Sequence, residues 1–499
     1  MNDLTRRQVL RSMAVPLAAQ AQRPSGRANV LFLMADQHRG DCLSCDGHPA
    51  VRTPNLDRIA REGVRFRSAY STTPTCTPAR SGLLTGMAPW RHGMLGYGAV
   101  AAKYPLEMPR IMRDAGYFTM AIGKLHYTPQ RNLHGYHAAL LDESGRVESI
   151  DFKSDYRAWF ATQAPNLNPD ATGVGWNDYK GKPYVLPEEL HPTHWTSDVA
   201  VRFLETYARP EPFFLKVSFA RPHSPYDPPQ RWMNAYSDAR IPNAAAGAWA
   251  SRNVERNTDR DDLWRGQLDP AEIRKSRQAY YGSVSFIDEQ IGRILDALER
   301  RGMADNTLVV YTSDHGDMTG DQHLWRKSYA YEPSARIPML LRWPSGLVSA
   351  PRGQTLAQPV ELRDLLPTFA EAAGASLPAQ PDGRSLLTLI RTRGEGWRQW
   401  IDLEHDVCYA PENHWNALTS GQEKYVFHAR DGEEQLFDLR VDPSELKDLA
   451  GDPSHAESLR TWRRRMIDHL SVRGDTFVAG GKLALRPKSM LYSPNYPRG

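Results

Sequence analysis

Long apolar runs, cysteines and a strong charge imbalance are all scarce in this 499-residue chain. No stretch approaches the roughly 18 apolar residues that a membrane-spanning helix requires, so we expect no membrane span. The formal net charge is +4, from 62 basic and 58 acidic residues, which is too mild to indicate a nucleic acid partner. Four cysteines are few for an exported protein. With 40% hydrophobic and 24% charged residues, the composition is that of a globular protein.

The N-terminus has the features of an export signal. A twin-arginine pattern at Thr5–Leu10 precedes a short apolar run at Met13–Ala19, and Ala19–Ala21 offers a small-residue cleavage site. We therefore predict a Tat-type signal peptide over residues 1–21 and a periplasmic or secreted protein. A plain basic N-terminus without a targeting role is the alternative.

Four apolar runs rich in β-branched or aromatic residues end in clusters of polar side chains. Near-continuous apolar strands indicate a sheet that is covered on both faces. Helical stretches separate the runs, so we predict a doubly wound α/β fold with a largely parallel sheet and helices on both faces. Ligands bind such folds beyond the carboxyl ends of the strands. The four predicted strands are Val30–Met34, Phe118–Ile122, Phe213–Phe219 and Leu308–Thr312.

The composition changes after residue 385 and predicts a second, smaller domain. Short alternating strands and then a basic helix follow between residues 400 and 470, which indicates a small antiparallel sheet with one packed helix. We predict a catalytic α/β domain over residues 22–390, a C-terminal α+β subdomain over residues 391–475 and an irregular tail over residues 476–499.

Cys76 opens what we predict to be a short helix. Pro78 suits the first turn of a helix, where its missing N–H is not needed. Unpaired amides and the helix dipole attract anions to this end, and Arg80 lies one turn from Cys76 on the same side. We therefore expect an anionic group to bind over this turn, although a cysteine alone is more often a small buried hydrophobic residue.

Two strand ends carry residues suited to a divalent cation. Asp36 and Gln37 follow one predicted strand, and Asp314 and His315 follow another. Carboxylate and amide oxygens favour a hard ion such as Ca²⁺, and the imidazole would also admit Mn²⁺ or Mg²⁺. Either pair alone is more often a helix cap or a loop hydrogen bond; their joint placement is what predicts a metal site.

The run Cys76–Gly86 resembles the signature of the type I sulfatases, the arylsulfatases and polysaccharide sulfatases of the alkaline phosphatase superfamily. In that family the cysteine is oxidised before folding to formylglycine (3-oxoalanine), whose hydrate is the nucleophile. Ala79 replaces the serine that is most often found there. The resemblance extends to Asp36-Gln37 and Ser313–Gly316, which match metal-ligand segments, and it makes residue 76 a further ligand.

The same resemblance assigns roles to four further basic residues, which lie in shorter motifs. Lys124 and His126 stand in Gly-Lys-Leu-His, His223 follows Arg-Pro, and Lys327 ends Leu-Trp-Arg-Lys. It implies that Arg80 and Lys124 stabilise the hydrated aldehyde and that His126 is the base. It also implies that His223 and Lys327 bind the sulfuryl group, and that one of them protonates the leaving oxygen.

The predicted function is hydrolysis of sulfate monoesters, either aryl or carbohydrate sulfates, with formylglycine-generating machinery as a partner. A phosphonate or phosphate ester hydrolase that uses the same nucleophile is the alternative, and an inactive protein that binds sulfated glycans is a more distant one. Six aromatic residues in the polar segments could stack on a sugar or aryl ring, or could equally be structural: Tyr156, Trp159, Trp176, His191, His194 and Trp195.

Overall fold

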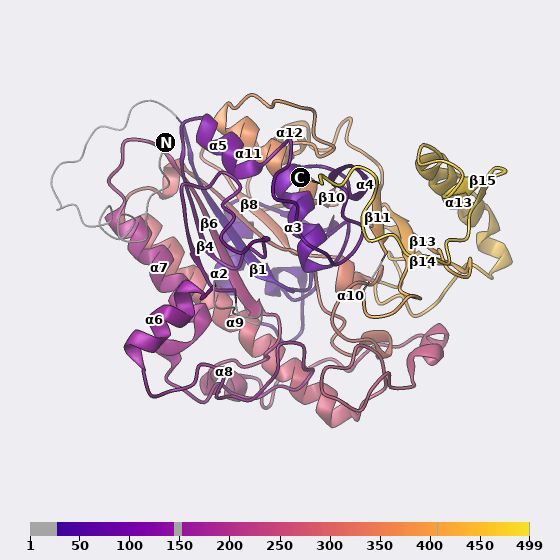
Figure 1. Cartoon of the computed structure of the whole chain (residues 1–499), viewed down its shortest axis with the longest axis horizontal. Helices are drawn as coiled ribbons and strands as arrows, with labels where there is room; N and C mark the ends of the chain where they lie inside the picture. Colours follow the sequence, from indigo (N-terminus) through magenta and orange to yellow (C-terminus); the bar gives the residue numbers. More distant parts are fainter. Residues whose placement is uncertain (1–26, 144–151, 407, 499) are drawn as a thin grey trace.

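The computed structural model describes residues 27–143, 152–406 and 408–498; the predicted signal peptide lies outside these residues. A central sheet of eight strands dominates the molecule (Figure 1). In spatial order its strands are β5 (Ala138–Leu141), β4 (Phe118–Gly123), β6 (Phe213–Pro222), β1 (Asn29–Asp36), β7 (Thr307–Ser313), β8 (Met339–Arg342), β2 (Val64–Phe66) and β9 (Gln354–Leu356).

Most neighbouring strands of this sheet are parallel. Strands β5, β4, β6, β1 and β7 form a continuous parallel block, in which Val30 lies between Phe214 and Leu308. Strand β8 runs antiparallel to both β7 and β2, and β9 is parallel to β2. The predicted α/β fold with a largely parallel sheet is confirmed, and the carboxyl ends of β1, β4, β6 and β7 lie at one edge.

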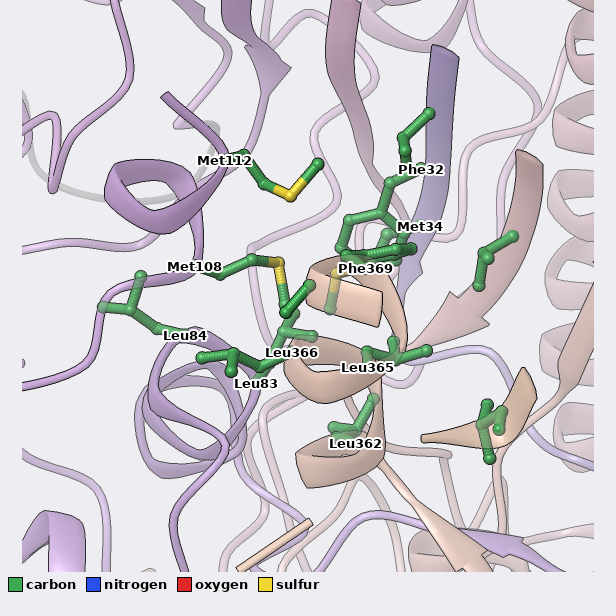
Figure 2. Close-up of a cluster of buried hydrophobic side chains, with 14 of the residues drawn as sticks. Phe32, Met34, Leu83, Leu84, Met108, Met112, Leu362, Leu365, Leu366 and Phe369 are labelled. Carbon is green, nitrogen blue, oxygen red and sulfur yellow. The ribbon is translucent and has the colours of Figure 1, made fainter. Parts of the chain in front are cut away.

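Alternate residues of β1 face two different layers of helices. Phe32 and Met34 pack against Leu83 of α3, Met112 of α5 and Phe369 of α11 in one buried cluster (Figure 2). Leu31 and Leu33 belong to a second cluster with residues of the other layer. The first layer contains α3 (Cys76–Thr85), α5 (Met108–Asp114), α11 (Leu365–Ala373) and α12 (Leu386–Thr392), and the second contains α2 (Pro54–Arg61), α7 (Pro192–Thr206) and α9 (Pro270–Arg300).

A second sheet follows the α/β layers in the chain. Its strands β11 (Ile401–His405), β12 (Trp415–Thr419), β13 (Glu423–His428) and β14 (Glu434–Asp438) are antiparallel in sequential order, and α13 (Ala456–Ser471) packs on them. The predicted small antiparallel sheet with one helix is confirmed, whereas the exact domain boundaries stay predictions.

Residues near the C-terminus return to the first layer of helices. The N–H of Leu95 donates to the carbonyl of Leu491, and that of Ser493 donates to Gly93. Among the described residues, no helix is long and apolar enough to cross a bilayer. The remaining elements are β3 (Ala69–Tyr70) paired with β10 (Val360–Glu361), the hairpin β15 (Val478–Ala479) and β16 (Lys482–Leu483), and the helices α4 (Pro89–His92), α6 (Asp155–Gln163), α8 (Gln230–Ala235) and α10 (Glu332–Ala335).

Candidate active site

Helix α3 begins at Cys76, as the sequence predicts, and every residue of it is buried. Thr75 is extended immediately before it, so the chain turns sharply into the helix at the cysteine. Leu83 and Leu84 at its other end are fixed in the apolar cluster of Figure 2. The helix is therefore anchored by its C-terminal half, while its N-terminus presents Cys76 to the carboxyl ends of the strands.

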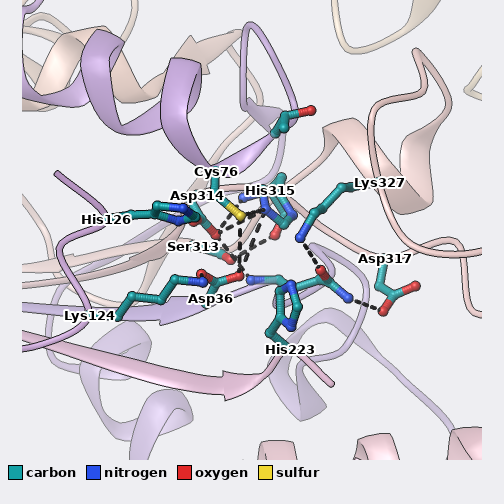
Figure 3. A network of polar contacts seen from close by, with 12 residues as sticks. Asp36, Cys76, Lys124, His126, His223, Ser313, Asp314, His315, Asp317 and Lys327 are labelled. Atoms are coloured by element: carbon teal, nitrogen blue, oxygen red, sulfur yellow. Dashed lines mark hydrogen bonds and ion pairs between the residues drawn. The ribbon is translucent and has the colours of Figure 1, made fainter. Parts of the chain in front are cut away.

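Four potential metal ligands surround this N-terminus (Figure 3). Ligand atoms of Asp36, Cys76, Asp314 and His315 all lie within 4.8 Å of one another, and all four residues are buried. The Nε2 atom of His315 is 3.2 Å from the Cys76 Sγ, 3.8 Å from Asp36 Oδ1 and 3.7 Å from Asp314 Oδ1. Residues from β1, from the start of α3 and from the segment after β7 thus form one cluster.

The surroundings of this cluster fit a divalent cation. The Nδ1 atom of His315 is 2.9 Å from the Gly316 carbonyl, to which it donates, so the Nε2 lone pair faces the cluster. Asp314 Oδ1 accepts from the backbone N–H groups of Gln37 and His315, both at 3.1 Å. Two carboxylates and an oriented imidazole are a donor set that suits Ca²⁺, Mn²⁺ or Mg²⁺.

Arg80 hydrogen-bonds both carboxylates of the cluster. Its Nε donates to Asp314 Oδ2 at 2.9 Å and its NH2 group to Asp36 Oδ2 at 3.1 Å. Its NH1 group donates to the carbonyl of Lys124 at 2.7 Å, which ties helix α3 to the end of β4. Although burial disfavours its charge, these two carboxylates raise the pKa of Arg80 above its usual value.

Lys124 reaches the same carboxylate from the end of β4. Its Nζ lies 2.5 Å from Asp36 Oδ2. The preceding Gly123 has φ +92°, and a Cβ there would lie 2.0 Å from the carbonyl oxygen of Ser218, so only glycine fits this turn. Burial raises the pKa of Asp36, but the charges of Lys124, His223, Arg80 and Lys327 hold it well below its usual value.

Lys327 and His223 lie on the other side of Cys76 from Lys124 and His126 in Figure 3. The Lys327 Nζ donates to Gln37 Oε1 at 2.9 Å, and the Gln37 Nε2 donates to Asp317 Oδ2 at 2.5 Å. The side-chain amide of Gln37 therefore bridges Lys327 and Asp317. Its assignment as a metal ligand stays a prediction.

The imidazole of His223 is held by its neighbours. Its Nδ1 is 2.7 Å from the carbonyl of Ser224, and the indole of Trp176 stacks on its ring at 4.4 Å between centroids. The Nζ of Lys124 lies 4.7 Å from the centroid of the same indole. Among the six aromatic candidates, Trp176 thus contacts two predicted catalytic residues, whereas Tyr156, Trp159 and Trp195 pack on one another.

The charges of the site act on the Cys76 thiol in opposite directions. Burial and the carboxylate of Asp36 raise its pKa, but Lys327, Lys124 and His315 lower it more, so that the pKa lies below its usual value. The effect on Lys327 is reciprocal: burial opposes its charge, yet Cys76 and Asp36 raise its pKa. The pocket is therefore built to hold negative charge at residue 76.

Three residues that support the site were absent from our expectations. Glu143 Oε1 accepts the backbone N–H of Leu125 at 2.9 Å and that of His126 at 2.8 Å, and it follows the end of β5 just as the predicted clusters follow their strands. Asp317 lies two residues beyond His315 and accepts a hydrogen bond from Gln37, but no sequence pattern distinguishes it from other polar loop residues. Thr75 is 2.7 Å from His405 Nε2, a contact across 330 residues that no local pattern could indicate.

A buried ligand cluster and cationic side chains at the carboxyl edge of a covered sheet suit an enzyme that acts on an anionic substrate. Residues 28–375 match the sulfatase family, and residues 320–471 match the C-terminal family of N-sulphoglucosamine sulphohydrolase. The chain therefore belongs to the sulfatase family, within the alkaline phosphatase superfamily, and is a hydrolase of sulfate esters.

Individual relatives agree with this assignment. The chain is 36% identical to an arylsulfatase from Clostridium perfringens, over 92% of this chain and 97% of that protein. It is 31% identical to a choline-sulfatase from Rhizobium meliloti, over 84% and 81% of the two chains. Among solved structures, the phosphonate monoester hydrolase of Agrobacterium radiobacter has the same fold, with a TM-score of 0.75, 24% identity and coverage of 89% and 95%.

Proposed function

We propose that Cys76 is converted to formylglycine and that the protein hydrolyses aryl or carbohydrate sulfate monoesters with this residue as its nucleophile. The observation that carries the proposal is the position of the Cys76 side chain, which lies at a helix N-terminus within a cluster of two carboxylates and an imidazole. Arg80, Lys124 and Lys327 provide positive charge around it. Formylglycine-generating machinery in the host is the partner that this proposal requires.

We propose a divalent cation, with Ca²⁺ first and Mn²⁺ or Mg²⁺ as alternatives, held by Asp36, Asp314, His315 and residue 76. When bound, the cation would neutralise charge on a sulfate oxygen and make the hydrated aldehyde more acidic, and that hydrate would supply the oxygen that attacks sulfur. The carboxylates are already oriented by Arg80, so they need little rearrangement to bind the ion.

The chain's own residues would divide the remaining work. Lys124 and Arg80 stabilise negative charge on the hydrated aldehyde at residue 76, and Lys327 and His223 bind oxygens of the sulfuryl group. Lys327 or His223 donates a proton to the leaving oxygen as the ester S–O bond breaks. His126 then accepts a proton from residue 76, which allows inorganic sulfate to leave and regenerates the aldehyde.

A phosphonate or phosphate ester hydrolase is the second candidate. The chain shares its fold with two phosphonate monoester hydrolases, at TM-scores of 0.75 and 0.74, and this likeness in fold is what supports the second candidate. Sulfate and phosphonate esters present similar tetrahedral anions to the same cationic side chains. The relative rates on the two ester classes therefore distinguish the proposals. Export through the twin-arginine signal remains part of the proposal.

Replacement of the nucleophile tests the proposal directly. We expect Cys76→Ala to abolish turnover of nitrophenyl sulfate while the fold is retained, because Cys76 belongs to none of the apolar clusters of the described residues. Cys45→Ala, outside the site, is the matched control and should keep full activity. Intact-mass measurement should show the aldehyde at residue 76 of the wild type. A Cys76→Ala protein with near-normal sulfatase activity would refute the role, and faster turnover of a phosphonate monoester would favour the second candidate.

A further inference from the structure

Trp176 differs from the other tryptophans of the chain in what surrounds it. Of the 13 tryptophans, it is the only one that neither belongs to an apolar cluster of the described residues nor packs against one. Its side chain is nonetheless half-buried. An indole usually stabilises a fold through the large apolar area that it buries, so the position of Trp176 needs another explanation.

The indole of Trp176 contacts two side chains of the active site. The imidazole of His223 stacks on it, with 4.4 Å between the ring centroids and 24° between the ring planes. The Nζ of Lys124 lies 4.7 Å from the centroid of the same indole. Figure 3 shows Lys124 and His223 approaching Cys76 from different sides. Because the face of an indole attracts cations, one side chain stabilises the positions of both groups.

The stacked indole fixes the direction of one ring nitrogen of His223. The Nδ1 atom lies 2.7 Å from the carbonyl of Ser224, which can only accept, so Nδ1 carries a proton and Nε2 is left to act on a substrate. A single hydrogen bond still allows the imidazole to turn about the line of that bond. Contact between the two ring faces removes this freedom, because such a turn would push the imidazole into the indole. The direction of Nε2 is therefore determined by Ser224 and Trp176 together.

The turn that carries Trp176 is attached to the residue after His223. Within this turn the N–H of Gly175 donates to Asp178 Oδ2 at 2.5 Å, and the N–H of Asp178 donates to the carbonyl of Gly175 at 3.2 Å. The buried hydroxyl of Ser224 lies 2.9 Å from the carbonyl of Gly175 and 2.7 Å from that of Asp178, and it donates to them. Trp176 and His223 are thus connected twice, through their ring faces and through this hydroxyl.

Backbone hydrogen bonds hold the rest of this loop against the segment that follows His223. The N–H of Lys182 donates to the carbonyl of Tyr226 at 3.0 Å, and the N–H of Tyr184 donates to that of Pro228 at 2.9 Å. The two segments run parallel at these points. The indole is therefore in place before a substrate arrives, and no loop has to be ordered during the reaction.

We propose that Trp176 is a positioning residue, which holds the imidazole of His223 in the orientation from which Nε2 protonates the leaving oxygen. This inference rests on the proposed function and specifies which of its two candidate acids acts. In that step the ester S–O bond breaks and its electron pair moves to the leaving oxygen. The Nε2–H bond of protonated His223 breaks as the new O–H bond forms. A general acid contributes about 10²–10⁴-fold to such a step, provided that it stays within hydrogen-bonding reach of the oxygen.

Phenyl sulfates with different ring substituents test this inference. Nitrophenolate leaves without a proton, whereas methylphenolate is a poor leaving group, so only the methylphenyl ester depends on the acid. We expect Trp176→Leu to lower kcat about 100-fold on methylphenyl sulfate and less than about threefold on nitrophenyl sulfate, with KM unchanged within about twofold. Lys124 keeps its ion pair with Asp36 in this variant. Trp176→Phe retains an aromatic face and should stay within about fivefold of the wild type on both esters.

Ser224→Ala provides an independent test, because it removes the hydroxyl that anchors the turn but leaves the carbonyl that accepts from His223. It should lower kcat about tenfold on methylphenyl sulfate alone. The double variant should be no slower than Trp176→Leu, because both changes act through the same imidazole. Trp232→Leu is the matched control: its indole is also half-buried, with the Cζ of Arg231 5.2 Å from its centroid, and its loss should affect both esters equally.

The outcomes separate this inference from the proposed function. Hydrolysis of nitrophenyl sulfate by the wild type, and its loss in Cys76→Ala, tests the proposed function alone. If Trp176→Leu lowers kcat equally on both phenyl sulfates, Trp176 is structural; if it raises KM at constant kcat, the indole binds substrate. Either result would overturn the inference, as would a wild type whose kcat/KM already falls steeply from the nitrophenyl to the methylphenyl ester. If phosphonates are the better substrates, the same two leaving groups on a phosphonate measure the effect.

Discussion

Arg80 shows how a single residue organises charge in this protein. It is almost completely buried, yet it contacts both carboxylates of the potential metal site and the backbone of the lysine that follows β4. Buried charges are tolerated only when they are paired and hydrogen-bonded, and here the pairing also fixes the carboxylates in position. A lysine could not replace it, because the three contacts start from three separate nitrogens of the planar guanidinium, whereas lysine has a single nitrogen.

Removal of the cation should weaken both activity and folding. A ligand present at 100 times its Kd adds about 2.7 kcal/mol of stability, which corresponds to roughly 3 °C in melting temperature for a chain of this size. We therefore expect exhaustive chelation to lower the melting temperature by about that amount, and Ca²⁺ or Mn²⁺ to restore it.

Asp314→Asn provides the control for chelation. Because it removes one carboxylate from the cluster, its melting temperature should not respond to the chelator. A wild-type melting curve that is unchanged after chelation, with no ion found by elemental analysis, would contradict the metal assignment.

At the scale of elements, strand β11 of the small sheet reaches into the active site. His405 at its end contacts the hydroxyl of Thr75, which also lies 2.7 Å from the hydroxyl of Ser328. The backbone N–H of Glu404 donates to the carbonyl of Thr72 at 2.8 Å. The C-terminal sheet thus holds the segment that leads into helix α3 against the loop that carries Lys327.

Thr75→Val should uncouple these segments. Loss of the hydroxyl leaves the buried His405 and Ser328 without their partner, so the free energy of unfolding should fall by about 1–3 kcal/mol. Displacement of residue 76 should also lower kcat/KM about tenfold or more, as measured on nitrophenyl sulfate alongside urea unfolding.

The other end of the same helix supplies the comparison. The hydroxyl of Thr85 donates to the carbonyl of Ser81 at 2.8 Å, far from the cluster, so Thr85→Val should cost stability with little effect on turnover. If Thr75→Val and Thr85→Val reduced activity to the same extent, the positioning role of Thr75 would be wrong.

The sequence predicted those elements whose signals are local. Buried parallel strands appear as continuous apolar runs, so β1, β4, β6 and β7 were located within a few residues of their observed ends. Polar residues at these ends predicted the cluster because parallel strands finish at one edge. Three other features depend on contacts between distant segments, which local residue patterns do not encode. They are the antiparallel pairing of β8 with β7, the hydrogen bond from Gln37 to Asp317, and the contact between His405 and Thr75.

At the scale of the whole molecule, buried histidines limit the pH range of the fold. Burial lowers the pKa of His92 and of His405 to about 3, with Arg363 adding to the effect at His92. In the unfolded chain both would take up a proton near pH 6.5. Between these values the unfolded state binds more protons, so the stability contributed by these residues is lost as the pH falls below about 6.5.

We expect the contribution of these two histidines to the free energy of unfolding to be constant above neutral pH and to decrease below pH 6. Each such histidine should contribute about 1–2 kcal/mol of destabilisation at pH 5. Urea unfolding between pH 5 and 7.5 measures the slope, and His92→Gln should make it shallower. His455→Gln, which removes a half-exposed histidine, should leave the slope unchanged; a His92→Gln protein with the wild-type slope would contradict the explanation.

The depth of Cys76 has a consequence for its proposed conversion to formylglycine. Only 2% of this residue is accessible in the folded chain, so an oxidising enzyme can reach it only while the chain is nascent or unfolded. Residues 491–493 complete the packing beside helix α4, which adjoins the helix that carries the cysteine, and they are synthesised long after it. The yield of active protein would then depend on the rate of oxidation of Cys76 relative to the rate of folding. A molecule that folds before oxidation would stay unmodified.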